Sequence, residues 1–342
     1  VARLMDAAPS LPDPDALAVA VIAGERAALA RALNLLDDRR DEARRHAAAF
    51  LSRLQAQMAP DRSHLAGITG PPGAGKSSLT AALIAHWRRA GLRVGVLAVD
   101  PSSPISGGAL LGDRLRMKTS VDDDGVFVRS LACRGEFGGL SAEVWPMSLV
   151  MLAAFDITLI ETVGVGQREI DVARMCDTTC FVAQPGSGDS IQFLKAGILE
   201  VPHVLVVNKE DMGAVAQRTL SELSGVLKRR QDDDGWEVPV LSASATRGTG
   251  IGALADTLQR HRALLAEDGS LAARRRRYQG HWLLKRLREE FGSFGIQRLG
   301  GEHALLERTA GDGGSPFVQL ESLRQHLLRE FESARHQETT PD

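Results

Sequence analysis

The stretch Gly-Ile-Thr-Gly-Pro-Pro-Gly-Ala-Gly-Lys-Ser-Ser, residues 67–78, decides the fold of this 342-residue chain. It contains the spacing Gly70-x-x-x-x-Gly75-Lys76-Ser77, the pattern of a phosphate-binding loop. An apolar run at 65–69 predicts a buried strand before the loop, and the apolar spacing of 77–87 predicts a helix after it. Glycines let the backbone wrap around phosphate oxygens, so that consecutive N–H groups and the helix N-terminus face the anion. The sequence therefore predicts a nucleotide-binding site.

The lysine and the serine of this loop have distinct expected roles. Lys76 is expected to reach the β- and γ-phosphates of a nucleotide, and the Ser77 hydroxyl is expected to coordinate Mg²⁺. The candidate phosphate-binding residues are Gly70, Pro71, Pro72, Gly73, Ala74, Gly75, Lys76, Ser77 and Ser78.

The composition is that of a globular protein, with 44% apolar and 25% charged residues. A net charge of −2 argues against non-specific nucleic-acid binding, which needs a basic surplus. Three cysteines, Cys133, Cys176 and Cys180, predict buried thiols in a reducing compartment. The longest apolar run, 144–155, is too short to span a bilayer, and the N-terminus does not resemble a signal peptide. We expect a cytoplasmic protein with no nucleic-acid or membrane partner.

Strand and helix patterns alternate from residue 65 onward, which predicts an α/β fold with a mostly parallel sheet. Because such sheets bind ligands at the carboxyl ends of their strands, polar residues at those ends are expected to share one site. We expect a P-loop nucleotide-binding domain over 61–265, flanked by helical extensions over 1–60 and 266–342. The expected strands are 65–69, 93–100, 126–129, 156–161, 179–183, 203–208 and 238–242.

The two extensions are expected to be helical. Residues 15–58 are rich in Ala, Leu, Arg and Glu and predict two or three helices, with the charges of 37–45 on a solvated helix face. Amphipathic patterns at 274–290 and 317–335 predict further helices. The basic run 274–277 is expected on the solvated face of its helix, with a partner-binding patch as the alternative.

The tetrapeptide Asn208-Lys209-Glu210-Asp211 indicates which nucleotide binds. It ends an apolar strand and matches the Asn-Lys-x-Asp pattern of GTP-binding proteins. An aspartate carboxylate can accept hydrogen bonds from the ring N1–H and the exocyclic amine of guanine, a donor pair that adenine lacks. Ser244-Ala245, after the next strand, resembles the loop whose backbone contacts guanine in such proteins. The candidate residues for binding GTP or GDP at the base are Asn208, Lys209, Asp211, Ser244 and Ala245.

Two acids that end apolar strands, Asp100 and Glu161, are the expected partners of Ser77 around Mg²⁺. Each carboxylate would project from its strand end toward the phosphates. The expected metal ligands are therefore Ser77, Asp100 and Glu161.

The sequence Glu161-Thr-Val-Gly164 replaces the commoner Asp-x-x-Gly, whose glycine N–H contacts the γ-phosphate. Gly164 is accordingly a candidate nucleotide-sensing residue. The next position holds Val165 instead of the glutamine that orients the attacking water in many small G proteins. Gln167 joins Lys76 and Glu161 as a catalytic candidate, although this motif does not identify the water-orienting group. We therefore expect slow intrinsic hydrolysis that a partner accelerates.

Together these residues resemble the MeaB/ArgK-type (human MMAA-like) G proteins, chaperones of adenosylcobalamin-dependent acyl-CoA mutases. The resemblance runs from the N-terminal helices to the charged helix near Trp282. Asp-Pro-Ser-Ser at 100–103 and Glu-Thr-Val-Gly-Val-Gly-Gln at 161–167 are much more specific for this family than a phosphate loop alone. The other matching segments are 67–78, 98–99, 107–117, 208–211 and 244–245.

The resemblance implies a Mg²⁺-dependent, homodimeric GTPase that gates cofactor loading and protects a mutase from inactivation, with dimerisation expected in the C-terminal extension. It implies that Asp113 and Arg116 belong to a switch segment, so both are catalytic candidates. It also implies that residues 185–195 communicate with the mutase. Residues 130–139, Ser-Leu-Ala-Cys-Arg-Gly-Glu-Phe-Gly-Gly, depart from the family's Ser-Pro-Ser-x-Gly-x-Leu-Gly-Gly. We interpret this departure as the mark of a different partner, such as a relative of methylmalonyl-CoA mutase.

Three other functions share parts of this pattern. A metal-delivery GTPase for metalloenzyme maturation would have a similar core, but it should also bring a His- or Cys-rich tract, and none is visible among the scattered histidines. A protein kinase of transport systems would need a base aligned on an acceptor hydroxyl, which no sequence feature demands. A scaffold whose nucleotide only stabilises the fold is the third alternative.

Overall fold

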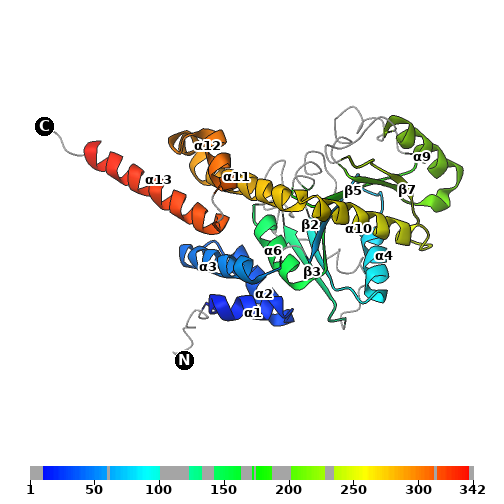
Figure 1. Cartoon of the computed structure of the whole chain (residues 1–342), viewed down its shortest axis with the longest axis horizontal. Helices are drawn as coiled ribbons and strands as arrows, with labels where there is room; N and C mark the ends of the chain where they lie inside the picture. Colours follow the sequence, from blue (N-terminus) through cyan, green and yellow to red (C-terminus); the bar gives the residue numbers. More distant parts are fainter. Residues whose placement is uncertain are drawn as a thin grey trace, which may run out of the picture. The chain divides into compact units, whose positions relative to one another are not determined.

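A computed structural model of the chain contains a seven-stranded sheet in the order β3-β2-β4-β1-β5-β6-β7 (Figure 1). Each strand pair in this sheet is parallel. The expected α/β class is confirmed. The structure describes residues 11–59, 62–100, 123–132, 142–162, 172, 175–186, 202–227, 235–311 and 314–338.

The strands follow the apolar segments of the sequence closely. The largest differences are in β3, which runs on to Ala132, and in β7, which starts only at Val240. The strand bounds are β1 His64–Thr69, β2 Val94–Asp100, β3 Val126–Ala132, β4 Ile157–Thr162, β5 Thr178–Ala183, β6 Val204–Val207 and β7 Val240–Ser242.

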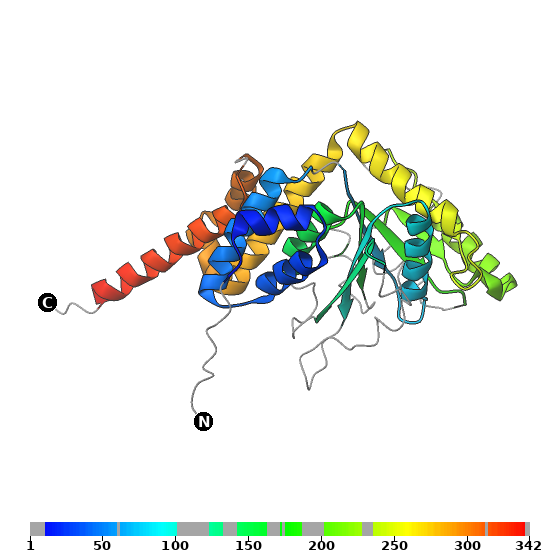
Figure 2. The same ribbon diagram turned by 90° about the horizontal axis from the view of Figure 1, so that it is seen from below.

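Helices cover both faces of the sheet (Figures 1 and 2). On β5, Cys180 and Val182 pack into the cluster that contains α4 and α10, whereas Phe181 and Ala183 pack into the cluster that contains α9. This alternation follows from the period of two along a strand, and because both faces are apolar, both are buried. Among the described residues, the helices that pack most extensively on the sheet are α4 Lys76–Arg89, α6 Val144–Ala154, α9 Ala214–Leu227 and α10 Ile251–Glu267.

Gly95 of β2 lies close under side chains of α6 and the residue that follows it. A Cβ atom at Gly95 would lie 2.6 Å from Met151 Cε and 2.8 Å from a ring carbon of Phe155, so a larger residue here would force these two side chains to shift. The apolar run that is too short for a membrane is therefore a core helix. Both described cysteines, Cys176 and Cys180, are buried free thiols, as expected.

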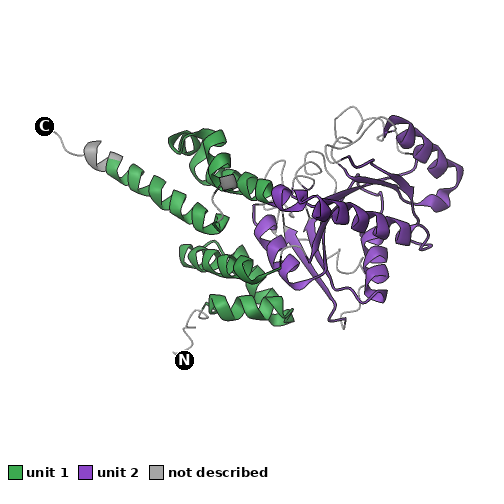
Figure 3. Ribbon diagram, in the orientation of Figure 1, with its two compact units in different colours: residues 1–59, 276–342 green, residues 60–275 purple. Residues whose placement is uncertain are grey.

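The terminal segments of the chain belong to one compact unit. Residues 1–59 and 276–342 form one unit, and residues 60–275 form the other, with the boundary inside α11 (Figure 3). In the first unit α3 packs against α1, α2 and α13. Two or three helices were expected in the N-terminal extension, and the structure has three there, α1, α2 and α3. The helices of this unit are α1 Pro14–Ile22, α2 Arg26–Asp37, α3 Asp41–Gln57, α12 Gly301–Gly311, α13 Pro316–Glu338 and the part of α11 from residue 276 on; α11 as a whole is Ser270–Arg298, with a kink at Gly292.

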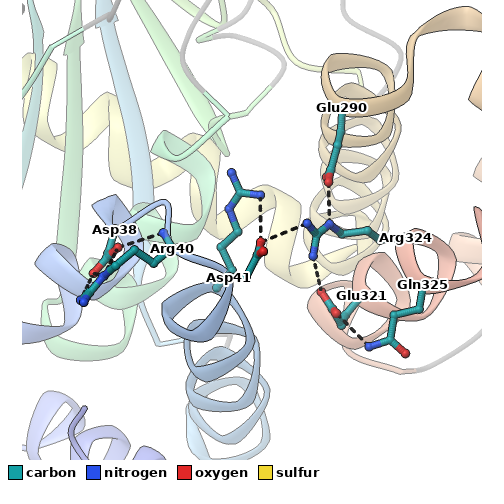
Figure 4. A network of polar contacts seen from close by, with 8 residues as sticks. Asp38, Arg40, Asp41, Glu290, Glu321, Arg324 and Gln325 are labelled. Atoms are coloured by element: carbon teal, nitrogen blue, oxygen red, sulfur yellow. Dashed lines mark hydrogen bonds and ion pairs between the residues drawn. The ribbon is translucent and has the colours of Figure 1, made fainter. Parts of the chain in front are cut away.

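Arg324 of α13 joins three helices of this unit (Figure 4). Its Nε donates to Glu290 Oε1 of α11 at 2.5 Å, and its Nη2 donates to Asp41 Oδ1 of α3 at 3.1 Å. The hydrogen bond to Glu290 raises the pKa of the Arg324 guanidinium. The Arg324 side chain is only 16% exposed, so these contacts link N- and C-terminal helices that lie far apart in the sequence.

The charged run at 37–45 does not form one helix face, so that expectation is wrong. Asp38 and Arg40 lie between α2 and α3 and interact with each other, the Arg40 side chain lowering the pKa of the Asp38 carboxyl (Figure 4). A charge pattern alone did not reveal the break between the two helices.

The basic run at 274–277 was also expected on a solvated face, and half of it is not. Arg275 donates to both carboxylate oxygens of Asp177, at 2.9 and 2.6 Å, and to Ser63 O at 3.0 Å. Asp177 is fully buried and its carboxylate also accepts from Leu65 N at 2.9 Å. Arg274 contacts the ring of the buried His203, whereas the other two arginines are exposed. The first two arginines of the run therefore fasten the start of α11 to the amino-terminal edge of the sheet.

Buried histidines lie at the same edge. His64 Nε2 and His261 Nδ1 both lie 2.8 Å from Thr178 Oγ1. Because a hydroxyl has one proton and two lone pairs, Thr178 can donate to only one of the two rings and accepts from at least one of them. Burial lowers the pKa of His64 to about 4 and that of His261 to about 2. Both rings are therefore neutral near pH 7.

We expect this histidine pair to make the fold sensitive to acid. The folded pKa of His64 lies below the value of about 6.5 for a free histidine, so its contribution is present above about pH 6.5 and is lost as the pH falls to about 4. The loss from His64 is about 3 kcal/mol at about 1.4 kcal/mol per pKa unit. Urea unfolding of the wild type and of His64→Gln between pH 7.5 and 4.5 gives the free energy of unfolding at each pH. The loss from His64 is the difference between the two proteins in the slope of that free energy against pH.

The control is His303→Gln, which changes a side chain that is 90% exposed and should keep the wild-type slope. Equal pH slopes for the wild type and His64→Gln would show that His64 does not carry the effect.

Candidate nucleotide-binding site

The phosphate loop lies between β1 and α4, at the carboxyl edge of the sheet. Gly75 directly precedes α4 with a φ of 86°, a left-handed conformation that favours glycine. Gly70 has a φ of 139°, and a Cβ atom there would lie 2.3 Å from Val182 O of β5. Both positions therefore favour glycine because of their positive φ. At Gly70, β5 also leaves no room for a side chain.

Lys76 lies inside this loop. Its ammonium group donates to Gly70 O at 2.8 Å and to Pro71 O at 2.9 Å, and the residue is 6% exposed. The loop thus wraps around a buried positive charge at the start of α4, where the helix N-terminus also favours an anion. Pro72, in the turn after Pro71, and Ser78, in the first turn of α4, complete the predicted set.

Ser77 and Glu161 meet at the edge of the loop. The Ser77 hydroxyl donates to Glu161 Oε1 at 2.5 Å, and Glu161 is 5% exposed. Hydroxyl and carboxylate oxygens are the ligands that Mg²⁺ prefers, so this pair fits the ion. Ala98 of β2 pairs with Glu161 of β4 along the main chain, and Asp100 follows Ala98 by two residues in the same strand. The side chain of Asp100 lies outside the described residues.

The end of β6 is tied to the phosphate loop. Asn208 Nδ2 donates to Ala74 O at 2.9 Å, and its Oδ1 accepts from Ala245 N at 3.3 Å. Lys209 Nζ donates to Gly73 O at 2.7 Å. Lys209 has a φ of 61°, in the left-handed region that non-glycine residues seldom adopt. Asn208 and Lys209 therefore connect the loop after β6 to the phosphate loop, and Asn208 also connects it to the loop after β7.

Asp211 follows in the turn η2, Glu210–Met212, and points toward the loop after β7. The buried Ser244 hydroxyl donates to Asp211 Oδ1 at 2.6 Å, and this bond lowers the pKa of the Asp211 carboxyl. Thr249 Oγ1 donates to Glu210 Oε2 at 3.0 Å, a second tie between the same loops. The structure thus presents an ionised, exposed carboxylate held in one orientation.

The structure brings together the predicted residues of the phosphate loop, Glu161 and the base-recognition residues. The sequence did not lead us to expect two hydrogen bonds of this site. Thr249 Oγ1 donates to Glu210 Oε2, and Thr162 Oγ1 donates to Thr69 Oγ1 at 3.2 Å beside the phosphate loop. No local pattern marks a hydroxyl of this kind, since serine and threonine occur throughout the chain. The predicted residues Asp113, Arg116, Gly164 and Gln167 lie outside the described residues.

The parallel sheet with a phosphate loop between β1 and α4 makes this chain a P-loop nucleotide-binding protein, and its Asn-Lys-x-Asp strand end is that of the GTP-binding class. The match to a family model settles the family. Residues 29–294 match the model described as methylmalonyl Co-A mutase-associated GTPase MeaB. The chain belongs to the MeaB family, as the motifs led us to expect, and it is a GTPase that binds guanine nucleotide.

Relatives from an archaeon, a bacterium and a mammal support this assignment. A GTPase of Pyrococcus horikoshii is 42% identical over 74% of this chain and 79% of its own length. The GTPase ArgK of Escherichia coli is 37% identical over 78% and 81%. The mitochondrial methylmalonic aciduria type A homolog of Mus musculus is 34% identical over 80% and 69%.

Among solved structures, the one titled LAO/AO transport system kinase superposes with a TM-score of 0.67 at 26% identity, covering 93% of this chain and all of its own. The similarity therefore extends beyond the sheet to the terminal helices. In the part of the chain that the structure describes, no helix is both long and apolar enough to cross a membrane.

Proposed function

We propose that this protein is a Mg²⁺-dependent GTPase that acts as a chaperone of an adenosylcobalamin-dependent acyl-CoA mutase, methylmalonyl-CoA mutase or a relative. It would gate cofactor loading and protect the mutase from inactivation. The observation that carries this proposal is the family match over residues 29–294, because the family is described by its association with that mutase. The name of the mouse relative supports the same partner class.

The site geometry supports the role of Mg²⁺. Ser77 and Glu161 would hold the ion, which would neutralise charge on the phosphates during transfer to water. Asp100, Gly164 and Gln167 remain proposed site residues, as do Asp113 and Arg116 in the proposed switch. GTP turnover should require added Mg²⁺ and stop with a chelator.

GTP turnover with and without a purified mutase tests the proposed function. We expect slow intrinsic turnover that rises at least about tenfold with the cognate mutase, since partners of G proteins commonly complete the catalytic site. A metalloenzyme precursor serves as the comparison partner. Stimulation by the precursor and not by any cobalamin-dependent mutase would favour metal delivery instead. Transfer of phosphate to an added protein would favour a kinase.

Replacing Asp211 with asparagine should relax the preference for guanine. The amide loses the double acceptor for N1–H and the exocyclic amine, and its NH₂ can donate to the O2 atom of xanthine. Loss of a charge-assisted bond of about 1.5–3 kcal/mol predicts GDP binding about 10- to 100-fold weaker. Competitive titration with GDP and xanthosine diphosphate measures the change. Retained discrimination against the xanthine nucleotide would remove Asp211 from base recognition.

We also propose that the C-terminal helices form a homodimer interface. Phe294 of α11 is 61% exposed, and Leu328 of α13 is 40% exposed. The Phe294 and Phe331 rings stack at 6.2 Å between centroids, so apolar side chains of the two helices meet at this point. Sedimentation should report a dimer for the wild type and a monomer for Phe294→Glu, with Val19→Glu, a 59% exposed residue of α1, as the control. A dimer that persists in Phe294→Glu would place the interface elsewhere.

A further inference from the structure

Two buried threonine hydroxyls meet where the central strands separate beside the phosphate loop. Thr162 Oγ1, at the end of β4, donates to Thr69 Oγ1, at the end of β1, at 3.2 Å. Both side chains are almost fully buried, with Thr69 2% and Thr162 1% exposed. Thr69 directly precedes Gly70 of the loop, and Thr162 directly follows Glu161. The bond between the two hydroxyls therefore joins the two segments that carry the proposed Mg²⁺ ligands.

The strand pairing shows what this bond connects. The paired residues of β1 and β4 end with Ile68 opposite Glu161. One position further along, β1 continues to pair with β5, and β4 continues to pair with β2. The carboxyl edge of the sheet thus divides here into a β1–β5 half and a β2–β4 half. The hydroxyl bond links Thr69 of the first half to Thr162 of the second.

Each half supplies one of the proposed Mg²⁺ ligands. Ser77 follows β1 through the phosphate loop, and Glu161 belongs to β4. Glu161 faces α4, because its Oε1 accepts from the Ser77 hydroxyl at 2.5 Å. Successive side chains of a strand point to opposite faces, so Thr162 points to the other face of the sheet. The threonine pair therefore acts on the ligands through the spacing of the two strand ends.

We propose that Thr69 and Thr162 are positioning residues of the metal site, and that their bond fixes the spacing between the strand end that leads to Ser77 and the strand end that carries Glu161. The proposal rests on the role of Mg²⁺ proposed above. Groups behind the ligands of a metal commonly contribute about 10- to 100-fold to its affinity, because they hold the ligands in place before the ion binds. Without the hydroxyl bond, the two halves are less firmly joined at this level, so the affinity for Mg²⁺ should fall.

Thr158 provides a matched control on the same strand. It lies four residues before Thr162, so both threonines project from the same face of β4. The Thr158 hydroxyl is buried and has no hydrogen-bond partner among the described residues. Replacing Thr158 with valine therefore removes a buried hydroxyl from this face without breaking a bond between strands.

The experiment titrates Mg²⁺ into the full chain bound to a fluorescent, non-hydrolysable GTP analogue. The proteins are the wild type, Thr162→Val, Thr69→Val, Thr162→Ser and Thr158→Val. We expect either Thr162→Val or Thr69→Val to raise the dissociation constant of Mg²⁺ about tenfold. Affinity for the analogue in a chelator should stay unchanged, because Lys76 and the phosphate loop are retained. Thr162→Ser keeps the hydroxyl and should restore the constant, and Thr158→Val should match the wild type.

Three results would overturn this inference. They are an unchanged Mg²⁺ constant in the valine variants at 69 and 162, an equal rise in Thr158→Val, and a failure of Thr162→Ser to restore the constant. Urea unfolding shows whether each variant is folded. If Thr162→Val is not, Thr69→Val carries the same test, because either substitution removes the bond.

The Ser77→Ala variant separates failure of this inference from failure of the proposed metal site. It removes a proposed ligand and should raise the Mg²⁺ constant more than the valine substitutions do. If Ser77→Ala raises the constant while Thr162→Val and Thr69→Val do not, only the role of the threonine pair is wrong. If none of these substitutions changes it, the ion binds elsewhere and both proposals fail.

Discussion

Lys76→Ala should lower the affinity for GTP by at least about 100-fold. The ammonium group is buried in the phosphate loop, where its bonds to the phosphates are charge-assisted and weakly screened. A hydrogen bond to a charged group contributes about 1.5–3 kcal/mol, and about 2.7 kcal/mol corresponds to a factor of 100. Titration of a fluorescent GTP analogue measures the loss directly.

The control for this substitution is Lys285→Ala, which removes a partly exposed lysine paired with Glu289 on α11. It should bind GTP as the wild type does. Both variants should unfold at wild-type urea concentrations, because the Gly70 and Pro71 carbonyls can be hydrated once Lys76 is truncated. Wild-type affinity in Lys76→Ala would place the nucleotide outside this loop.

Arg275→Met should destabilise the unit of residues 60–275 by about 3–5 kcal/mol. The substitution leaves the Asp177 carboxylate fully buried without its cation, and breaking a buried pair in this way carries a penalty of about that size. The remaining donor, Leu65 N, satisfies only one of its oxygens. Urea unfolding followed by tryptophan fluorescence measures the change in the free energy of unfolding.

Two further variants sharpen this test. Arg218→Met removes an exposed arginine and should change the stability by less than about 1 kcal/mol. The double variant Arg275→Met/Asp177→Asn should recover part of the loss, since no uncompensated charge remains buried. A loss in Arg275→Met as small as that in Arg218→Met would mean that water reaches Asp177.

The phosphate loop and the sheet were predictable because their signals are local. Gly70, Gly75 and Lys76 are close in sequence, and their spacing reflects one turn of backbone around one ligand. The strands were predictable because both faces of the sheet are buried, so most of their residues are apolar. Glu161 could be placed near Ser77 because parallel strands end at a common edge.

Residue 275 shows the opposite case. An arginine within a run of four is usually solvated, and nothing near it in the sequence announces Asp177, which lies 98 positions away. The same holds for Arg324, whose partner Asp41 is 283 positions away. Contacts of this kind depend on which surfaces pack together, and charge alone does not select among the many carboxylates of the chain.

The sequence alone was therefore enough to establish a parallel α/β protein that binds GTP, because each motif encodes a short piece of backbone and the chemistry it performs. The three-dimensional arrangement was needed to join the first and last helices into one unit and to bury a charge pair under the start of α11. These features result from packing between segments that are distant in the sequence, which buries their surfaces away from water. No local pattern of residues determines which distant segments pack together.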